Sequence, residues 1–326
     1  MSESQQLTLD PRAQRLDAGH RAVHREAVVG LETVVFTHGL PPDQAVPCFE
    51  DMARAIREEG AEPAACAVLG GKPTVGVSTG DLKRLIAAKP DKVTPATLPG
   101  AIALGRWAAT TAGAAMLLAH HRGVLTLATG GIGGVHRGGG WDISGDLGCL
   151  ARLPMVVVCS GAKSLLDMAA TMEVLETLGV IVLGYRTSEV PAFYTCSTGL
   201  SLEHRVDSPE EVTSVWHAAR AAGSPAAVLL LNPPPAEMAY DRHTVEEAVR
   251  FALETPSHGP STTPAHLAAV QERLGPRSVE LNRGLLVSNA RLAARVGLLI
   301  GTRTPTPDRC SLRAHPPEIS GSGRSL

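Results

Sequence analysis

Lys163 is the residue whose type and position point most directly to chemistry. It follows a short Ser160-Gly161-Ala162 loop that separates an apolar run, 155–159, from an amphipathic stretch, 164–178. A lysine at the start of a helix lies at the positive end of the helix dipole, which disfavours its ammonium form. The free amine is then a nucleophile that can form a Schiff base with a sugar carbonyl. On position alone, a solvated or anion-binding lysine remains the alternative.

The glycine spacing argues against two nucleotide-binding loops. A phosphate-binding loop needs Gly directly before its lysine, and Ala162 stands there instead. The segment 129–140, TGGIGGVHRGGG, reads G-x-G-x-x-His from Gly131, and no helical pattern follows at once. We therefore expect no nucleotide cofactor. The backbone N–H groups of this segment, with His136 and Arg137, are candidate oxyanion donors, and an extended turn with a solvated His-Arg pair is the alternative.

Two carboxylates follow this segment in the sequence Asp142-Ile143-Ser144-Gly145-Asp146. Carboxylate and hydroxyl oxygens suit a hard divalent ion such as Mg²⁺ or Mn²⁺, which would keep most of its waters with so few ligands. The alternative is that Asp146 caps a helix.

The elements that must position these residues alternate along the chain, which favours an α/β fold with a largely buried sheet. Apolar runs predict strands at 28–36, 64–69, 124–128, 155–159, 180–185 and 227–231. Helical patterns occupy 47–59, 80–88, 99–120, 164–178, 209–222, 245–253, 265–274 and 285–296. In the helix at 164–178, Ser164 and Asp167 have the spacing of a capping box.

Composition limits the class of protein. The 326 residues are 44% apolar and 19% charged, with net charge −2, and they suit one catalytic domain over 27–300 between a loose polar arm, 1–26, and a disordered tail, 301–326. With no basic stripe and 3% aromatic residues, we expect no nucleic-acid partner. The N-terminus lacks the apolar core of a signal peptide, and no uninterrupted apolar span stands out, which predicts a cytoplasmic protein without a membrane partner. The six cysteines show no zinc-ligand spacing.

Taken together, the segments resemble the pseudouridine-5′-phosphate glycosidase family, also called indigoidine synthase A-like. The resemblance covers about 27–296 and rests on LET (31–33), THGLP (37–41), TGGIGGVHRG (129–138), DISGDL (142–147), VVCSGAKSLLD (157–167), LETLGVIVLGYRTSEVPAFY (175–194) and SVELNRGLLVSNARLA (278–293). It implies a three-layer α/β/α fold with a mixed sheet, usually a homotrimer. It also implies Mn²⁺-assisted, reversible cleavage of a C–C glycosidic bond to ribose 5-phosphate and uracil.

The resemblance also implies roles for individual residues. Lys163 matches the family's Schiff-base lysine, Glu32 its proton donor and Asp142 the ligand of one largely hydrated Mn²⁺. The implied substrate-binding positions are Lys92, the backbone of Ala112, the segment Ser144, Gly145 and Asp146, and Asn282 near the base. His136 in the glycine-rich segment is a further candidate for binding the sugar phosphate.

Three segments depart from the family pattern. Pro95-Ala96-Thr97 replaces Arg-Arg-Asp after Lys92-Val93-Thr94, the segment 257–267 lacks the usual Gly-Lys and Thr-Pro-Phe-Leu-Leu, and Asn232-Pro233-Pro234-Pro235 replaces Asn-Pro-Ile-Pro. The differences suggest altered surroundings for the aglycone, the part joined to the sugar. A C-glycosynthase that joins ribose 5-phosphate to another carbon nucleophile, such as an aromatic polyketide, is therefore an alternative. A non-catalytic ribose-phosphate-binding protein is a third.

Overall fold

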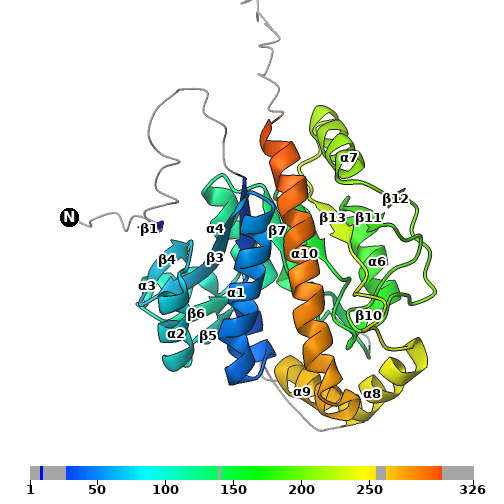
Figure 1. Ribbon diagram of the computed structural model, residues 1–326, viewed down its shortest axis with the longest axis horizontal. Helices are drawn as coiled ribbons and strands as arrows, with labels where there is room; N and C mark the ends of the chain where they lie inside the picture. The colour runs from blue at the N-terminus through cyan, green and yellow to red at the C-terminus, as the bar shows by residue number, and fades with distance from the viewer. Residues whose placement is uncertain (1–7, 10–26, 139–140, 255–261, 303–326) are drawn as a thin grey trace, which may run out of the picture.

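A mixed sheet runs through the centre of the fold, with helices on both faces (Figure 1). The computed structural model describes residues 8–9, 27–138, 141–254 and 262–302. Within them the main sheet has the order β1-β4-β3-β2-β7-β9-β13-β11-β12, while β6 pairs with β3 and β5, and β8 and β10 form a separate ribbon. The strands are β1 Thr8–Leu9, β2 Val28–Leu31, β3 Glu62–Leu69, β4 Lys72–Val75, β5 Asp91–Val93, β6 Ala108–Thr110, β7 Thr126–Ala128, β8 Val135–His136, β9 Val156–Cys159, β10 Leu166–Asp167, β11 Ile181–Tyr185, β12 Arg205–Val206 and β13 Val228–Leu231.

The central strands β2, β7, β9, β13 and β11 are parallel, and antiparallel pairing joins β3 to β4 and β6. Because successive side chains of a strand point to opposite faces, each strand serves two cores. Val158 and Leu230 belong to one core, whereas Val157 and Leu229 belong to the other. Burial on both faces explains why these strands read as continuous apolar runs.

The helices divide between the same two cores. Those contributing to the first are α1 Pro42–Glu58, α2 Thr79–Ala87, α7 Pro209–Ala221, α8 Arg242–Glu254, α9 Thr262–Leu274 and α10 Arg277–Thr302. Those contributing to the second are α3 Leu98–Ala103, α4 Ala112–His121, α5 Gly145–Leu150 and α6 Met168–Thr177. The predicted three-layer α/β/α fold with a mixed, buried sheet is thus confirmed.

The long helix α10 lies beside α1 across one face of the sheet (Figure 1). Its segment Arg277–Gly301 is long and apolar enough to cross a membrane, but 56% of its most apolar window is buried inside the protein. Its arginines form ion pairs with acidic residues in and next to α1. Arg283 pairs with Asp51, and Arg291 pairs at 3.0 Å with Glu59, which directly follows α1. The length and hydropathy of α10 therefore reflect its place as a core helix.

Several predicted boundaries were wrong. The strand predicted over 28–36 ends at Leu31 and is followed by a π-helical turn, η2, at Val35–Gly39. The single helix predicted over 99–120 is instead α3, β6 and α4, because Gly105, with φ of +69°, allows the chain to turn after α3. The helix predicted from 164 begins at Met168. The predicted arm, 1–26, and tail, 301–326, lie almost wholly outside the described residues, and the domain limits stay a prediction.

The buried amide of Asn289, on α10, joins the carboxyl ends of three adjacent strands. Its Nδ2 donates to the backbone carbonyl of Thr129 at 2.9 Å and to Ser160 Oγ at 3.1 Å. Its Oδ1 accepts from Asn232 Nδ2 at 2.9 Å. These partners directly follow β7, β9 and β13, so one side chain fixes the relative positions of all three strand ends.

We predict that Asn289→Ala lowers the free energy of unfolding by about 2–4 kcal/mol, because it leaves several buried polar groups without partners. Urea denaturation measures the effect. Ser288→Ala is the matched control, since the Ser288 hydroxyl receives one hydrogen bond from Asn232, at 3.1 Å, and its loss should cost about 1 kcal/mol. Equal losses in the two variants would contradict the role given to Asn289.

Candidate active site

Four of the predicted site residues, Glu32, Lys92, Lys163 and Asn282, line one cavity of about 50 Å³. Glu32 directly follows β2, Lys92 lies in β5, Lys163 is on the loop after β9, and Asn282 is on α10. The cavity therefore opens at the carboxyl ends of parallel strands, where open α/β sheets usually bind their ligands.

Backbone contacts fix the loop that carries Lys163. The Lys163 N–H donates to the carbonyl of Ile132 at 3.2 Å, and the Ile132 N–H donates to the carbonyl of Gly161 at 3.1 Å. Gly161 has φ of +91°, and a Cβ there would lie 2.0 Å from the carbonyl oxygen of Pro191. Only glycine fits this position, and the lysine loop is consequently held against the glycine-rich segment.

The prediction that Lys163 lies at a helix N-terminus was wrong. The N-cap of α6 is Asp167, whose Oδ1 accepts from the Ala170 N–H at 3.0 Å. Ser164 does not cap a helix, because its hydroxyl donates to the carbonyl of Ala192 at 2.8 Å. The dipole of α6 therefore does not act on Lys163 as the sequence suggested.

Glu32 is buried, and the Thr129 hydroxyl donates to its Oε1. Burial raises the pKa of the Glu32 carboxyl, while the nearby positive charge of Lys163 opposes this shift in part. A carboxyl group with a raised pKa retains its proton more readily at neutral pH. The environment of Glu32 therefore suits a proton donor.

Lys92 belongs to the same electrostatic cluster. Burial and the charge of Lys163 lower the pKa of the Lys92 ammonium, whereas Asp146 and Glu32 act in the opposite direction. Glu32, Lys92 and Lys163 thus line one small cavity, and the charge of Asp146 acts on Glu32 and Lys92 from outside its lining. Shifted pKa values, as at Glu32 and Lys92, are typical of a functional site.

The substrate-binding predictions at Ala112 and at 144–146 fall at the starts of α4 and α5. Ala112 is the first residue of α4, and Ser144 is the N-cap of α5 in place of Asp146. The buried Asp146 carboxylate accepts from the Gly113 N–H at 2.8 Å and from the Gly133 N–H at 2.9 Å. Asp146 therefore ties the start of α4 to the glycine-rich segment.

Asp142 and His136 do not line the cavity. The Asp142 side chain is 78% exposed, and its Oδ2 lies 3.9 Å from His136 Nδ1. No group of three His, Cys, Asp or Glu side chains in the described part of the chain is placed to hold a metal ion. One exposed carboxylate fits only a hard ion that keeps most of its waters.

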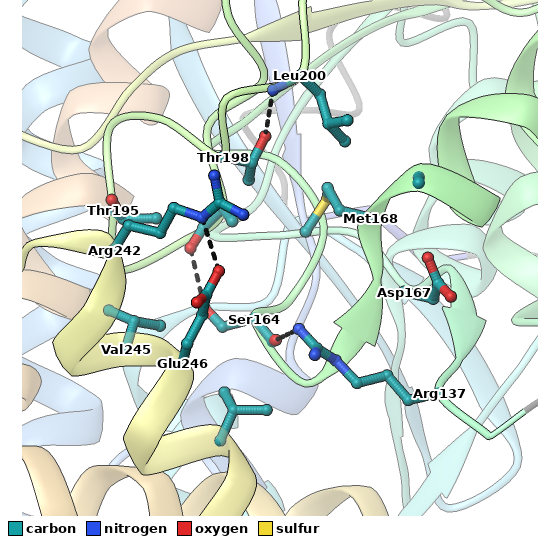
Figure 2. A pocket seen from close by; sticks show the side chains of 13 residues that line it. Arg137, Ser164, Asp167, Met168, Thr195, Thr198, Leu200, Arg242, Val245 and Glu246 are labelled. Carbon is teal, nitrogen blue, oxygen red and sulfur yellow. Dashed lines mark hydrogen bonds and ion pairs between the residues drawn. The ribbon is translucent and has the colours of Figure 1, made fainter.

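Arg137 braces the lysine loop from a second pocket, of about 280 Å³ (Figure 2). Its guanidinium donates to the carbonyl oxygens of Leu166 at 3.2 Å and Ser164 at 3.4 Å. Across this pocket, Arg242 donates to Glu246 at 2.6 Å. Arg137, a candidate oxyanion donor in the sequence, thus donates these N–H groups to carbonyl oxygens of the protein itself.

Several cavity residues received no role from the sequence, and the polar or aromatic ones are His38, Phe193, Tyr194 and Gln271. The first three lie within the segments that carry the family resemblance, which was the available signal. Gln271, on α9, had none. Phe193 adopts a φ of +57°, and its N–H donates to the carbonyl of Ser160 at 2.8 Å. Strained non-glycine residues of this kind concentrate at functional sites.

Of the three segments that depart from the family pattern, 257–267 reaches the cavity at Leu267. Pro95 packs at the starts of α4 and α5, where a Cβ on Gly113 would lie 2.9 Å from Pro95 Cγ, and neither Pro95, Ala96 nor Thr97 lines the cavity. Altered surroundings for the aglycone therefore stay a prediction. Asn232 belongs to the Asn289 network, and residues 257–261 lie outside the described residues.

Residues 20–298 match the family described as indigoidine synthase A like protein. This chain belongs to that family. It is 43% identical over 284 residues to a pseudouridine-5′-phosphate glycosidase from Gemmatimonas aurantiaca, covering 86% of this chain and 93% of the relative. It is 42% identical over 278 residues to one from Thermus thermophilus, covering 85% of this chain and 98% of the relative.

Two solved structures share the fold. An indigoidine synthase A-like protein from Thermotoga maritima has a TM-score of 0.81 at 32% identity, over 87% of this chain and 99% of its own. The prealnumycin C-glycosynthase AlnA, in complex with ribulose 5-phosphate, has a TM-score of 0.82 at 31% identity, over 92% of this chain and 98% of its own. The family therefore includes proteins named for both cleavage and synthesis.

We predict that Glu32→Gln stabilises the protein at neutral pH relative to the native chain. Burial raises the carboxyl pKa in the folded state, so the native glutamate loses stability as pH rises from the unfolded-state pKa through the folded-state pKa. The neutral amide has no such loss. Melting temperatures measured from pH 5 to 8 should diverge with rising pH, and a constant difference would show that ionisation of Glu32 is not responsible.

Proposed function

We propose that this protein is a pseudouridine-5′-phosphate glycosidase, which reversibly cleaves the C–C glycosidic bond to give ribose 5-phosphate and uracil. The observation that carries this proposal is the meeting of Glu32, Lys92 and Lys163 at one cavity. The names of relatives that share 39–44% of their aligned residues with this chain support the same activity. The expected substrate is thus a small sugar phosphate.

The bond to be broken explains why a lysine is needed. A C–C glycoside has no leaving heteroatom to protonate, so the usual pair of carboxylates cannot cleave it. Glu32 would instead protonate the ring oxygen, which opens the ribose. Lys163 would attack C1′, and expulsion of the aglycone would leave an imine between C1′ and Lys163. Hydrolysis of the imine releases ribose 5-phosphate.

Binding of the phosphate end would position the sugar for this attack. Lys92 supplies positive charge, and the backbone at Ala112, Ser144 and Gly145 lies at helix starts joined through Asp146. Backbone N–H groups at the start of a helix favour anions. Interactions with the non-reacting phosphate can fix the sugar close to Lys163 and so contribute to the rate.

We also propose one Mn²⁺, held by Asp142 and otherwise by water. When bound, such an ion would neutralise negative charge on the substrate. The resemblance to the family further supports a homotrimer located in the cytoplasm.

A C-glycosynthase remains the second candidate because of the structural similarity to AlnA. Both reactions need a lysine imine of a pentose phosphate, so the cavity alone does not separate them. Pro95 lies outside the cavity, beside Gly113 and Gly145, whereas Leu267 of another departing segment lines it. The names of the relatives favour the glycosidase.

Incubation with pseudouridine 5′-phosphate and Mn²⁺ should release uracil, and borohydride should trap ribose 5-phosphate on Lys163. Lys163→Ala should abolish both, and Lys163→Arg should not rescue them, because a guanidinium remains protonated. Peptide mass spectrometry locates the adduct. An adduct on Lys92 would reverse the roles of the two lysines. Adduct formation without uracil release would favour the synthase. The absence of both adduct and uracil release would favour a binding protein.

We predict that Asp142→Ala loses most of the activity. The loss should exceed the roughly 10–100-fold effect that is typical of a residue that only orients a metal ligand. The melting temperature should remain that of the native protein, because the Asp142 side chain is largely exposed. Full activity of this variant, or of the native protein in excess chelator, would refute the role of the metal.

A further inference from the structure

His38 lies on an unusual turn that places it at the cavity. Glu32 directly follows β2, and the π-helical turn η2 at Val35–Gly39 brings His38 back to the same cavity, which Lys92 and Lys163 also line. Turns of this kind are rare and occur frequently at functional sites. Glu32 is buried whereas His38 is exposed, so the histidine lies where the cavity meets solvent.

The hydrogen bonds of Thr37 favour one tautomer of His38. The Thr37 hydroxyl oxygen lies 3.2 Å from the carbonyl oxygen of Thr33, which can only accept a hydrogen bond. With its proton used there, the Thr37 hydroxyl accepts from His38 Nδ1, at 2.7 Å. The neutral ring then carries its proton on Nδ1 and leaves Nε2 as a proton acceptor.

The charges around His38 favour this neutral form. Partial removal from solvent and the positive charge of Lys92 both lower the pKa of the His38 imidazole. The other ionisable groups of the cavity are Glu32, Lys163 and Tyr194. Glu32 acts as an acid in the proposed reaction, and Tyr194 has a raised pKa because it is buried, so neither is a ready base at the start.

The proposed glycosidase reaction needs two further, linked proton transfers after Glu32 has protonated the ring oxygen. When the Lys163 amine attacks C1′, its nitrogen becomes positively charged and must lose a proton before its electron pair can expel the aglycone. The aglycone carbon must gain one proton as it takes the electron pair of the broken C–C bond. One group that accepts the first proton and donates it in the second step balances both requirements.

We propose that His38 is this proton-transfer residue, with Nε2 receiving the proton from the Lys163 adduct and returning it to the departing aglycone carbon. The inference rests on the proposed function and adds a residue to it. The choice of His38 over Glu32 rests on their positions. Glu32, a carboxylate once it has protonated the ring oxygen, is buried and accepts a hydrogen bond from Thr129, whereas His38 is exposed where the cavity meets solvent.

His38→Ala should lower kcat for pseudouridine 5′-phosphate by about 10²–10⁴-fold, the usual contribution of a positioned acid–base group. Added imidazole should restore part of the rate, whereas Lys163→Ala should show no such rescue. Borohydride trapping of ribose 5-phosphate should persist in His38→Ala, since imine formation from the free sugar involves no aglycone. Thr37→Val, which removes the partner of Nδ1, should lower kcat more than it changes KM.

The outcomes separate the two proposals. A native protein that releases no uracil would refute the glycosidase itself. Native-like turnover by His38→Ala would refute only the role of His38. A loss of both turnover and trapping, without rescue by imidazole, would assign His38 a structural role and overturn the inference.

Discussion

The hydrogen bonds of the Asn289 amide determine where the active-site loops begin. Thr129 precedes Gly130 and Gly131 of the cavity wall, Ser160 precedes the loop of Lys163, and Asn232 follows the third strand. Backbone and amide groups have strong directional requirements when they are buried, so this arrangement tolerates little displacement. The helix α10 therefore acts as a brace across β7, β9 and β13, and it also contributes Asn282 to the cavity.

Close backbone approach then completes the site. Gly161 passes against the carbonyl of Pro191, and a Cβ on Gly131 would lie 2.7 Å from the Phe193 ring. Three loops that are distant in sequence consequently pack closely, with the Phe193 ring directly against the backbone of Gly131. A nucleophile on such a loop has few alternative positions, which is the condition for productive attack on a bound sugar.

The sequence was informative where local pattern and tertiary structure agree. Buried parallel strands produced continuous apolar runs, and the residues of the family motifs, including Glu32, Lys92 and Lys163, met at one cavity. Local pattern failed where tertiary contacts decided the outcome. Ser164 has the spacing of a helix cap, yet its hydroxyl bonds to Ala192, and the helical pattern over 99–120 contains an internal strand, β6, that pairs with β3 and β5. Gln271 reaches the cavity only through the packing of α9.

The position of α10 in the chain has a consequence for biosynthesis. Its residues, Arg277–Thr302, are made after all the strands of the sheet. While the ribosome still holds this segment, the ends of β7, β9 and β13 lack Asn289, and the apolar face that α10 covers is exposed to solvent. Incomplete chains that expose such surface are prone to aggregate. The nascent protein should therefore depend on chaperones most strongly until α10 has left the ribosome and packed on the sheet.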